Sequence, residues 1–294
     1  MQHPTASART TAPRCGATEP SVIDPGAVLA WGVPKLRDLP WRSERDPWAI
    51  LVAEVMLQQT QAERVIPKWR AFVGAYPRPA DCASASLGDV LRLWQGLGYP
   101  RRARNLRATA ELVDEHHDGR LPDDLDALLA LPGIGPYTAR AVLAFAFERD
   151  VAVVDTNIAR VLARTTGERL SPKRAQAVAD SAVPQGHGWI WNQVIMDLGA
   201  TLCRPTPHCV DCPLTATCAW HLGGHLDPDP SVGSAGVSGR QAPFDGSDRQ
   251  ARGRVLAALH GGARPVAEFD DGVLATLVAD GLVEVRDSLV SLPT

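Results

Sequence analysis

Lysine, cysteine and long apolar runs are scarce in this sequence, and each scarcity excludes a class of protein. Only three of the 30 basic residues are lysines, so chemistry that needs a lysine has few candidates. Four of the six cysteines fall within 16 residues, which is unlike a disulfide framework spread along a secreted chain. No apolar run approaches the roughly 20 residues that cross a bilayer, and Met1 to Pro20 lacks the order of a secretory signal. We therefore expect a cytoplasmic protein without membrane contact.

The remaining composition is that of an ordinary folded protein. With 294 residues, 45% hydrophobic and 21% charged, the chain can build one large domain and a small one. The net charge of −3 does not predict a polyanionic partner, so any basic surface must be local.

Apolar residues recur at intervals of three and four along most of the chain, which predicts an all-α domain over residues 26–222. The segments with this spacing are Trp48–Gln59, Leu87–Trp94, Ala103–Glu115, Asp123–Ala130, Thr138–Phe147, Asn157–Arg164 and Trp191–Leu202. Residues 1–25 are rich in Thr, Ala, Ser and Pro, and we expect a disordered tail there.

A second, smaller unit is predicted behind a linker. Residues 223–247 are mostly Gly, Pro, Asp and Ser, which is linker composition. Residues 248–294 contain two helical patterns followed by two short strands, Leu282–Val285 and Ser288–Leu292. This order predicts a winged-helix-like unit, small enough to need support from the main domain.

Glu54 is the lone carboxylate of a helix that is apolar on nearly every side. Asp46 and Pro47 mark the start of this helix as its N-cap and first residue. Burial would raise the pKa of Glu54 and make it a proton donor near neutral pH. The alternative is a structural glutamate paired with an arginine. The polar run Gln58 to Gln61 follows, and it suits either contact with DNA bases or a solvated helix end.

The segment Leu131–Gly135 joins two predicted helices through two glycines, Gly133 and Gly135. Such a turn brings backbone N–H groups at the second helix's start close to an anion, which fits a helix-hairpin-helix holding DNA phosphates. A plain helix–helix turn is the alternative. Arg101, Arg102, Arg104 and Arg107 form a local basic patch behind Tyr99, either a phosphate-binding surface or a solvated face.

Asp155 ends a short apolar run and precedes another predicted helix, so it is a natural N-cap. Helix N–H groups would keep the pKa of Asp155 low and its carboxylate ionised, complementary to a protonated Glu54. Two carboxyl groups with divided roles are what cleavage of a glycosidic bond requires.

Four cysteines form the most specific local motif, with gaps of five, two and five residues. They are Cys203, Cys209, Cys212 and Cys218. Four thiolates in one loop suit zinc or a [4Fe-4S] cluster. The single Cys-x-x-Cys pair favours the cluster, because zinc ribbons supply two such pairs.

Taken together, these motifs resemble the helix-hairpin-helix DNA glycosylases, and among them the adenine DNA glycosylase (MutY) family. The resemblance rests on Ala53 to Thr60, Gly96 to Asn105, Leu131 to Thr138, Val154 to Asn157 and the four cysteines, in this order. It covers roughly residues 34–220 and implies the helix-hairpin-helix glycosylase fold with a C-terminal [4Fe-4S] loop at residues 203–218.

The activity implied by the resemblance is removal of adenine mispaired with 8-oxoguanine or guanine in double-stranded DNA, from a flipped-out nucleotide. Glu54 would protonate adenine, and Asp155 would stabilise the cationic sugar with Asn157 beside it. Tyr137 corresponds to the family's active-site tyrosine. The implied DNA contacts are Tyr99 as an intercalating side chain, Gln59 and Thr60 as strand-separating groups, and Arg37, Trp41 and Arg42 near the adenine pocket. We expect a monomer associated with the nucleoid.

Three features qualify the resemblance. Relatives of the endonuclease III type use a lysine where this chain has Tyr137, so we expect a monofunctional enzyme that leaves an abasic site. The family usually has six residues in the first cysteine gap, whereas this chain has five. The stretch after His221 is too short for the Nudix-like domain that reads 8-oxoguanine in typical members.

Two other interpretations remain open at this point. A thymine or uracil mismatch glycosylase of the same superfamily also lacks the lysine, and Glu54 argues against it. A non-catalytic iron-sulfur DNA-binding protein would not need both Glu54 and Asp155.

Overall fold

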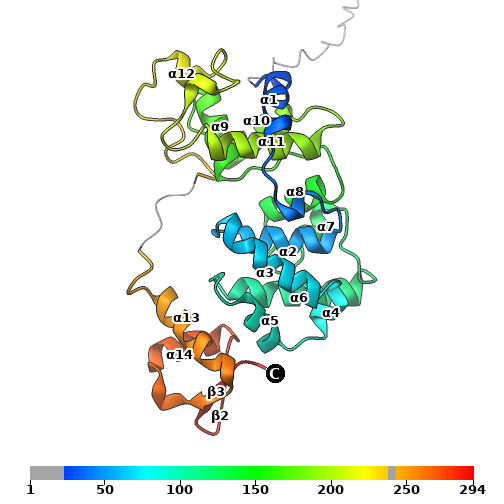
Figure 1. The fold of residues 1–294 in the computed structure, drawn as a ribbon, viewed down its shortest axis with the longest axis vertical. Helices are drawn as coiled ribbons and strands as arrows, with labels where there is room; N and C mark the ends of the chain where they lie inside the picture. The colour runs from blue at the N-terminus through cyan, green and yellow to red at the C-terminus, as the bar shows by residue number, and fades with distance from the viewer. Residues whose placement is uncertain (1–22, 238–242) are drawn as a thin grey trace, which may run out of the picture.

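The computed structural model describes residues 23–237 and 243–294 (Figure 1). Most of the predicted tail therefore lies outside the described residues. Its last residues do not continue a tail, because Ile23 is buried and Asp24 caps a helix that starts at Pro25. No helix among the described residues is long and apolar enough to cross a membrane.

The helical domain has two halves, each with its own hydrophobic core. One half comprises α2 (Pro47–Leu57), α3 (Ala62–Ala75), α4 (Pro79–Ala83), α5 (Leu87–Trp94), α6 (Arg101–His116), α7 (Leu125–Leu129) and α8 (Pro136–Phe145). The other comprises α1 (Pro25–Gly32), α9 (Thr156–Thr166), α10 (Pro172–Ala182), α11 (Gly188–Thr201) and α12 (Ala219–Leu222). Helix α8 packs on α2 and on α11, so it joins the two halves (Figure 1).

The predicted all-α class is confirmed, but several helices are longer, shorter or additional. α1, α3, α4, α10 and α12 have no counterpart among the predicted segments. α3 contains Pro67 and many charged residues, and α10 is largely polar, so apolar spacing alone does not reveal them. The first predicted helix ends at Leu57 rather than Gln59, because Gln58 already leaves the helical conformation with a ψ of 112°.

The predicted linker is only partly a linker. Asp229 forms an ion pair of 2.6 Å with the buried Arg164, and Ser231 and Ser234 are buried. Leu170 donates its backbone N–H to Ser234 Oγ at 2.9 Å. Residues 229–235 are therefore part of the α9 half, and their Gly, Ser and Pro content reflects tight packing of small side chains. Residues 238–242 lie outside the described part of the chain.

The C-terminal unit contains two helices and a small sheet. The helices are α13 (Asp248–Ala258) and α14 (Asp271–Ala279). The antiparallel sheet has the order β1-β3-β2, with Val285 paired to Val290, and its strands are β1 (Arg264–Pro265), β2 (Glu284–Arg286) and β3 (Leu289–Ser291). The hairpin was predicted, whereas β1 was not, since two residues ending in proline give no strand pattern.

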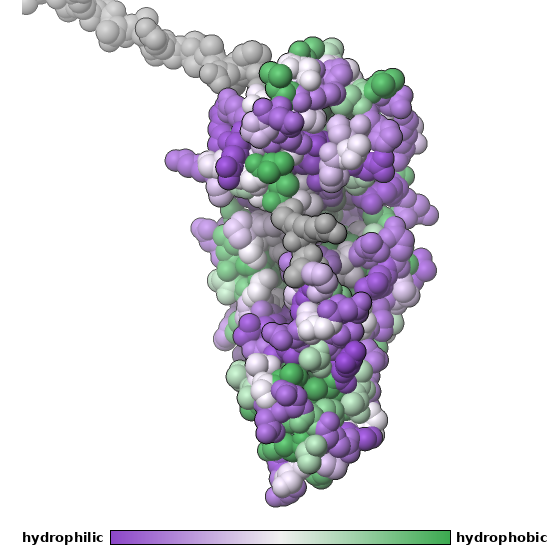
Figure 2. All heavy atoms as spheres, turned by 90° about the vertical axis from the view of Figure 1, so that its left-hand side faces the viewer, coloured by the Kyte–Doolittle hydropathy of each residue, from purple (hydrophilic) through white to green (hydrophobic). Residues whose placement is uncertain are grey.

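This unit is docked on the α5 and α6 side of the helical domain. Its buried side chains, among them Leu277 and Val290, belong to the same core as α2 and α6. Gly88 at the start of α5 donates its N–H to Pro293 O at 2.8 Å, and a Cβ at this glycine would lie 2.6 Å from that oxygen. Figure 2 shows a largely hydrophilic face with hydrophobic side chains gathered toward the lower end, over this unit.

Candidate active site and cysteine loop

Glu54 lies in the apolar helix α2, which Asp46 and Pro47 start as expected. Its side chain is 5% exposed. Burial raises the pKa of Glu54 from 4.5 to about 7, and the negative charge of Asp155 adds to this rise, while a hydrogen bond from Tyr137 and the charge of Arg42 oppose it. A carboxyl group with this pKa holds a proton in about half of the molecules at neutral pH.

Tyr137 links the glycine hairpin to Glu54. It is the second residue of α8, two residues after Gly135, and its hydroxyl donates to Glu54 Oε2 at 2.8 Å. Burial and the two neighbouring carboxyl groups raise the pKa of Tyr137 well above its usual value, so its hydroxyl keeps its proton and remains a donor. The hairpin therefore places a fixed donor against the buried acid.

Asp155 belongs to the other half of the domain and caps α9. Its carboxylate accepts from the backbone N–H groups of Ile158 and Asn157 at 2.7 and 3.0 Å. The side-chain Nδ2 of Asn157 donates to it at 2.9 Å. The expected low pKa is wrong, however: burial raises the pKa of Asp155 above its usual value in spite of these donors. The side chain has some exposed surface, yet protein atoms surround it closely enough for desolvation to dominate.

The two carboxyl groups nevertheless differ in the number of hydrogen bonds that they accept, as their different roles require. Asp155 accepts three hydrogen bonds, whereas Glu54 accepts one, from Tyr137. Because hydrogen bonds to a carboxylate favour its ionised form, Asp155 loses its proton before Glu54 does. Its charge is then one of the causes of the raised Glu54 pKa.

Arg37, Arg42 and Trp41 lie on the segment before α2. Arg42 is 8% exposed and forms a bidentate pair with Asp197 at 2.7 and 2.8 Å, and Arg37 Nε donates to the same carboxylate at 2.6 Å. The ring of Trp41 is buried against Trp69. The positive charge of Arg42 lowers the pKa of Glu54, and the ion pairs of Arg42 and Arg37 with Asp197 tie this segment to α11.

Asp197 was missed by the sequence reasoning. It is a buried carboxylate on α11, among mostly apolar residues. The signal that identified Glu54, a lone acid in an apolar helix, was present here too. Its two arginine partners lower the pKa of Asp197, although burial acts in the other direction. Asp197 is thus a fixed negative charge that holds Arg37 and Arg42.

Gln59, Thr60 and Tyr99 meet at one edge of the domain. Gln59 and Tyr99 both adopt left-handed backbone conformations, with φ of 55° and 48°. Thr60 Oγ1 donates to Leu97 O at 3.4 Å. Non-glycine residues in this conformation are strained and concentrate at functional sites. Two of the three predicted DNA-contact residues at this edge therefore share a costly conformation.

Arg102 holds the two loops of this edge together. Its guanidinium donates to Val55 O and Gln58 O at 2.7 Å on one side, and to Leu97 O and Gly98 O at 3.0 and 3.1 Å on the other. A pocket of about 120 Å³ lies next to it, lined by Gln58, Asn105 and Gly133 among others.

The basic patch behind Tyr99 has a different role from the phosphate surface considered above. Arg101 pairs with Asp280 of the C-terminal unit at 2.6 Å, and Arg104 donates to the backbone oxygen of the same residue. Arg107 donates to Ala85 O at 2.7 Å. With Arg102 turned inward, the four arginines all bind protein groups, and two of them dock the C-terminal unit.

The hairpin glycines occupy different environments. Gly133 has a φ of 74°, and a Cβ there would lie 2.8 Å from the side chain of Asn105, so only glycine fits. A Cβ at Gly135 would meet nothing within 4 Å. Gly135 is the N-cap of α8 and provides no side-chain hydrogen bond, so N–H groups of the first turn can bind an outside acceptor such as a phosphate.

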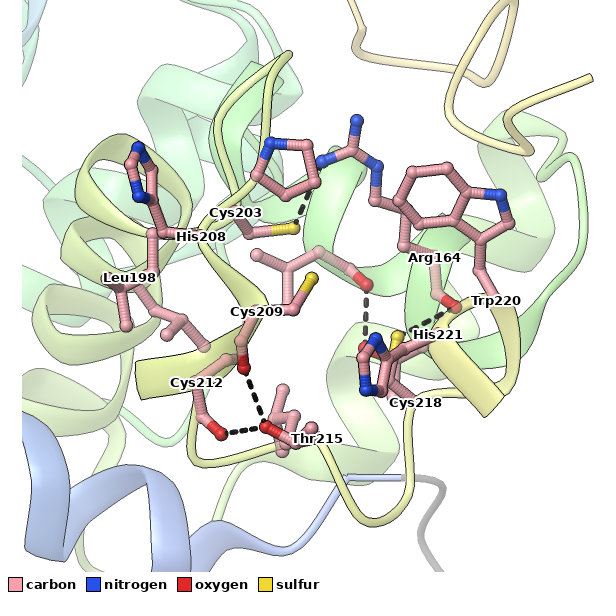
Figure 3. A pocket seen from close by; sticks show the side chains of 15 residues that line it. Arg164, Leu198, Cys203, His208, Cys209, Cys212, Thr215, Cys218, Trp220 and His221 are labelled. Carbon is pink, nitrogen blue, oxygen red and sulfur yellow. Dashed lines mark hydrogen bonds between the residues drawn. The ribbon is translucent and has the colours of Figure 1, made fainter. Parts of the chain in front are cut away.

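The four cysteines line one cavity between α9, α11 and the loop that follows (Figure 3). All four are free thiols and partly buried. Arg164 Nη1 lies 3.6 Å from Cys203 Sγ, and the Arg164 carbonyl accepts from Cys218. The shortened first gap therefore does not prevent the four thiols from gathering.

The spacing of the sulfurs bears on the kind of metal site. A single tetrahedral zinc ion with Zn–S bonds of about 2.3 Å requires sulfurs about 3.8 Å apart. Within the described residues, no three of the four sulfurs lie within 4.8 Å of one another. The group that does meet this limit is Cys209 with His221 and His225. The four thiols are thus not gathered at the spacing of a single ion, and a set of four cysteines is one that holds either zinc or an iron-sulfur cluster.

Comparison with known proteins yields close relatives. The HhH-GPD superfamily of base excision DNA repair proteins matches residues 52–184. An adenine DNA glycosylase of Mycobacterium tuberculosis is 41% identical, covering 94% of this chain and 97% of the relative. One from Mycolicibacterium smegmatis is 39% identical over 89% of this chain and 93% of its own length. The part of this chain outside the alignment with the M. tuberculosis relative is shorter than residues 248–294, so the alignment includes at least part of the C-terminal unit.

Solved structures resemble the helical domain. A thermostable thymine-DNA glycosylase superposes with a TM-score of 0.63 at 30% identity, covering 68% of this chain and 95% of its own. An endonuclease III trapped as a covalent DNA intermediate gives a TM-score of 0.59 at 25% identity, covering 66% and 92%.

Proposed function

The chain belongs to the adenine DNA glycosylase family of HhH-GPD base excision DNA repair proteins, and we propose that it removes adenine mispaired with 8-oxoguanine or guanine. The observation that carries this proposal is Glu54, a buried acid with a pKa of about 7, close enough to the Asp155 carboxylate for its charge to raise that pKa. Such a pair can donate a proton to a leaving base and stabilise the cation left behind.

The reaction begins with proton transfer from the Glu54 carboxyl group to a ring nitrogen of the flipped-out adenine. The protonated base then withdraws the electron pair of the glycosidic C–N bond, which breaks. Adenine leaves as a neutral molecule, and the sugar becomes an oxocarbenium ion. Water attacks the anomeric carbon and its proton passes to the Glu54 carboxylate, which restores the acid, so the net reaction is hydrolysis to free adenine and an abasic site.

Asp155 stabilises the oxocarbenium ion through its negative charge, and Asn157 holds that carboxylate in place. The Asn157 amide itself is fixed, because its oxygen accepts from Arg160 at 2.8 Å. Tyr137 orients Glu54 through their 2.8 Å hydrogen bond. Glu54 thus donates the proton, Asp155 stabilises the positive charge, and Tyr137 and Asn157 hold these two carboxyl groups in position.

The product should be an intact strand with an abasic site. Strand cleavage by a Schiff base requires an amine nucleophile. The three lysines are Lys35, Lys68 and Lys173, and the position behind the hairpin holds Tyr137. We therefore propose a monofunctional enzyme. Both carboxyl groups and Tyr137 come from one chain, so a monomer suffices, and genomic DNA as substrate would locate it at the nucleoid.

The proposed DNA contacts surround this site. The α8 start at Gly133 and Gly135 binds phosphate, while Gln59, Thr60 and Tyr99 enter the duplex and hold the strands apart. Trp41 and the arginines Arg37 and Arg42 border the route to Glu54. The strained backbone conformations of Gln59 and Tyr99 support insertion of these side chains into the duplex, because a loop already in its bound conformation needs no rearrangement on binding.

Cys203, Cys209, Cys212 and Cys218 are proposed to hold a [4Fe-4S] cluster. The donor set fits, since four free thiols line one cavity. When bound, the cluster would supply a covalent cross-link between α11 and the loop that precedes α12, and a centre able to exchange electrons. The hydrolysis itself uses only the side chains described above.

A panel of duplexes tests the proposal. Reconstituted protein is incubated under single-turnover conditions with A:8-oxoguanine, A:G, T:G and U:G mismatches, and free base and strand cleavage are measured separately. We expect release of adenine from the first two and an intact strand until alkali is added. The likeness to a thymine-DNA glycosylase makes thymine or uracil release the second candidate. Binding without release of any base would favour a non-catalytic role.

A further inference from the structure

The C-terminal unit reaches the Tyr99 edge with two side chains. Arg249, in the first turn of α13, donates through Nη1 to the Tyr99 hydroxyl at 3.1 Å. Its guanidinium carbon lies 5.9 Å from the centre of the Tyr99 ring and 6.0 Å from that of Phe244. Phe244, just ahead of α13, is 58% exposed. An arginine and two aromatic rings therefore meet at one place, from two units of the chain.

Contacts elsewhere between the C-terminal unit and the helical domain hold Arg249 and Phe244 beside Tyr99. Asp280, at the end of α14, pairs with Arg101 at 2.6 Å and with Arg252 one turn beyond Arg249. Gly88 and Pro293 join the far side of the unit to α5. Since α13 also buries Val255 in the shared core, the helix has a defined position relative to Tyr99.

Two guanidinium groups lie near the Tyr99 ring: that of Arg102 is 5.6 Å from the ring centre, and that of Arg249 is 5.9 Å from it. Arg101, Arg102, Arg104 and Arg107, the basic residues nearest in sequence to Tyr99, bind protein carbonyls or carboxylates. Arg249 donates to the Tyr99 hydroxyl and, at 3.4 Å, to Pro243 O, so it is the guanidinium that the C-terminal unit brings to this ring. A base stacked on the Tyr99 ring would have its centre about 4.5–7 Å from the ring centre. The Arg249 guanidinium carbon lies 5.9 Å from the same centre, so such a base would be next to this guanidinium.

We infer that Arg249 and Phe244, together with Tyr99, form the surface that reads the purine opposite the excised adenine. This inference rests on the proposed adenine glycosylase function. Arginine is suited to the task because its fork of donors binds guanine acceptors in pairs. 8-Oxoguanine presents an additional carbonyl oxygen at C8, which offers one more acceptor to the same donors. Phe244 adds an apolar ring on which a base can stack.

The test compares Arg249→Ala with Arg254→Ala, which removes the same charge from an exposed position of the same helix. Single-turnover adenine release is measured from duplexes with 8-oxoguanine, guanine or an abasic site opposite adenine. Arg249→Ala should reduce the preference for 8-oxoguanine over guanine by on the order of 10-fold, as expected for loss of a paired arginine contact. Opposite an abasic site, Arg249→Ala and Arg254→Ala should react equally, because no base remains to be read.

A companion variant, Phe244→Ala, should weaken binding to both base-containing mismatches without altering the preference. An equal loss on all three duplexes in Arg249→Ala would indicate a phosphate contact and overturn the inference. An unchanged preference would overturn it as well. Absence of adenine release by the unmodified protein would overturn the proposed function, and the inference with it. Thermal melting of each variant separates these results from undocking of the unit.

Discussion

The two halves of the helical domain bring the same functional group to one site in different surroundings. The α2 half presents Glu54 from an apolar helix with one hydrogen-bond donor, and its pKa rises to about 7. The α9 half presents Asp155 from a helix N-terminus with three donors. Both carboxyl groups are desolvated, so the number of donors, rather than burial alone, decides which of them keeps the proton.

This comparison explains why the site lies between two cores. A single core could bury one acid, but an ionised partner needs donors that only a helix end or polar side chains provide. Helix α8, which carries Tyr137, packs on α11 of the other half, and the pair of Asp197 with Arg42 also connects the two sides. The boundary between the two halves can therefore hold a protonated carboxyl group and an ionised one, each in its own surroundings.

Glu54→Gln breaks the acid side of the comparison and should have the largest effect. The amide keeps the shape but has no transferable proton, so single-turnover adenine release should fall by at least about 10³-fold. Mismatch binding, measured by fluorescence anisotropy, should be retained because Glu54 is buried away from the DNA backbone. Retained turnover in this variant would remove Glu54 from its role.

Asp155→Asn breaks the ionised side and should lower the rate by on the order of 10²-fold, through loss of charge at the oxocarbenium ion. Asparagine caps helices about as well as aspartate, so the melting temperature should change little. A matched loss of melting temperature and rate would instead indicate that Asp155 acts mainly as the cap of α9.

The pH dependence of the free energy of unfolding tests the raised pKa of Glu54 without measuring catalysis. Because folding raises the pKa of Glu54 from 4.5 to about 7, the folded state holds the proton more tightly, and stability falls as pH rises through this window. Glu54→Gln lacks this loss. It should be more stable than the unmodified protein above pH 7, by up to about 3 kcal/mol, with the advantage shrinking toward pH 4.5. Urea unfolding at several pH values measures it, and a pH-independent difference would contradict it.

Tyr137→Phe should have the smallest effect. It removes the donor that favours the ionised form of Glu54, so the pKa of Glu54 should rise further and the alkaline fall in rate should move to higher pH. The rate at the optimum should change by less than about 10-fold, as one neutral hydrogen bond is worth about 1 kcal/mol. The pH profile decides the matter: a shift toward lower pH would mean that Tyr137 acts in some other way.

Sequence reasoning identified the acid side of the site because its signal is local. A lone glutamate in an apolar helix implies burial, and burial implies a raised pKa. The pKa direction at Asp155 was wrong because the sequence shows the helix cap, whereas the burial that raises the pKa depends on tertiary packing. Asp197 was missed although it carries the same local signal as Glu54.

Composition misled where contacts between distant segments decide the structure. The arginines after Tyr99 suggested a phosphate surface, but Arg101 and Arg104 bind Asp280, some 180 residues later. Residues 229–235 had linker composition, yet Arg164 and Leu170 bind them to the α9 half. Neither pairing leaves a periodic pattern, so neither could be read from one sequence.

Direct titration of Glu54 tests the central claim most closely. Protein labelled with carbon-13 at the glutamate carboxyl groups is titrated by NMR, and the Glu54 resonance is identified by its absence in Glu54→Gln. The account predicts a midpoint near pH 7, well above the other glutamates. A midpoint near pH 4.5 would contradict it, since the group would then be ionised when adenine needs the proton.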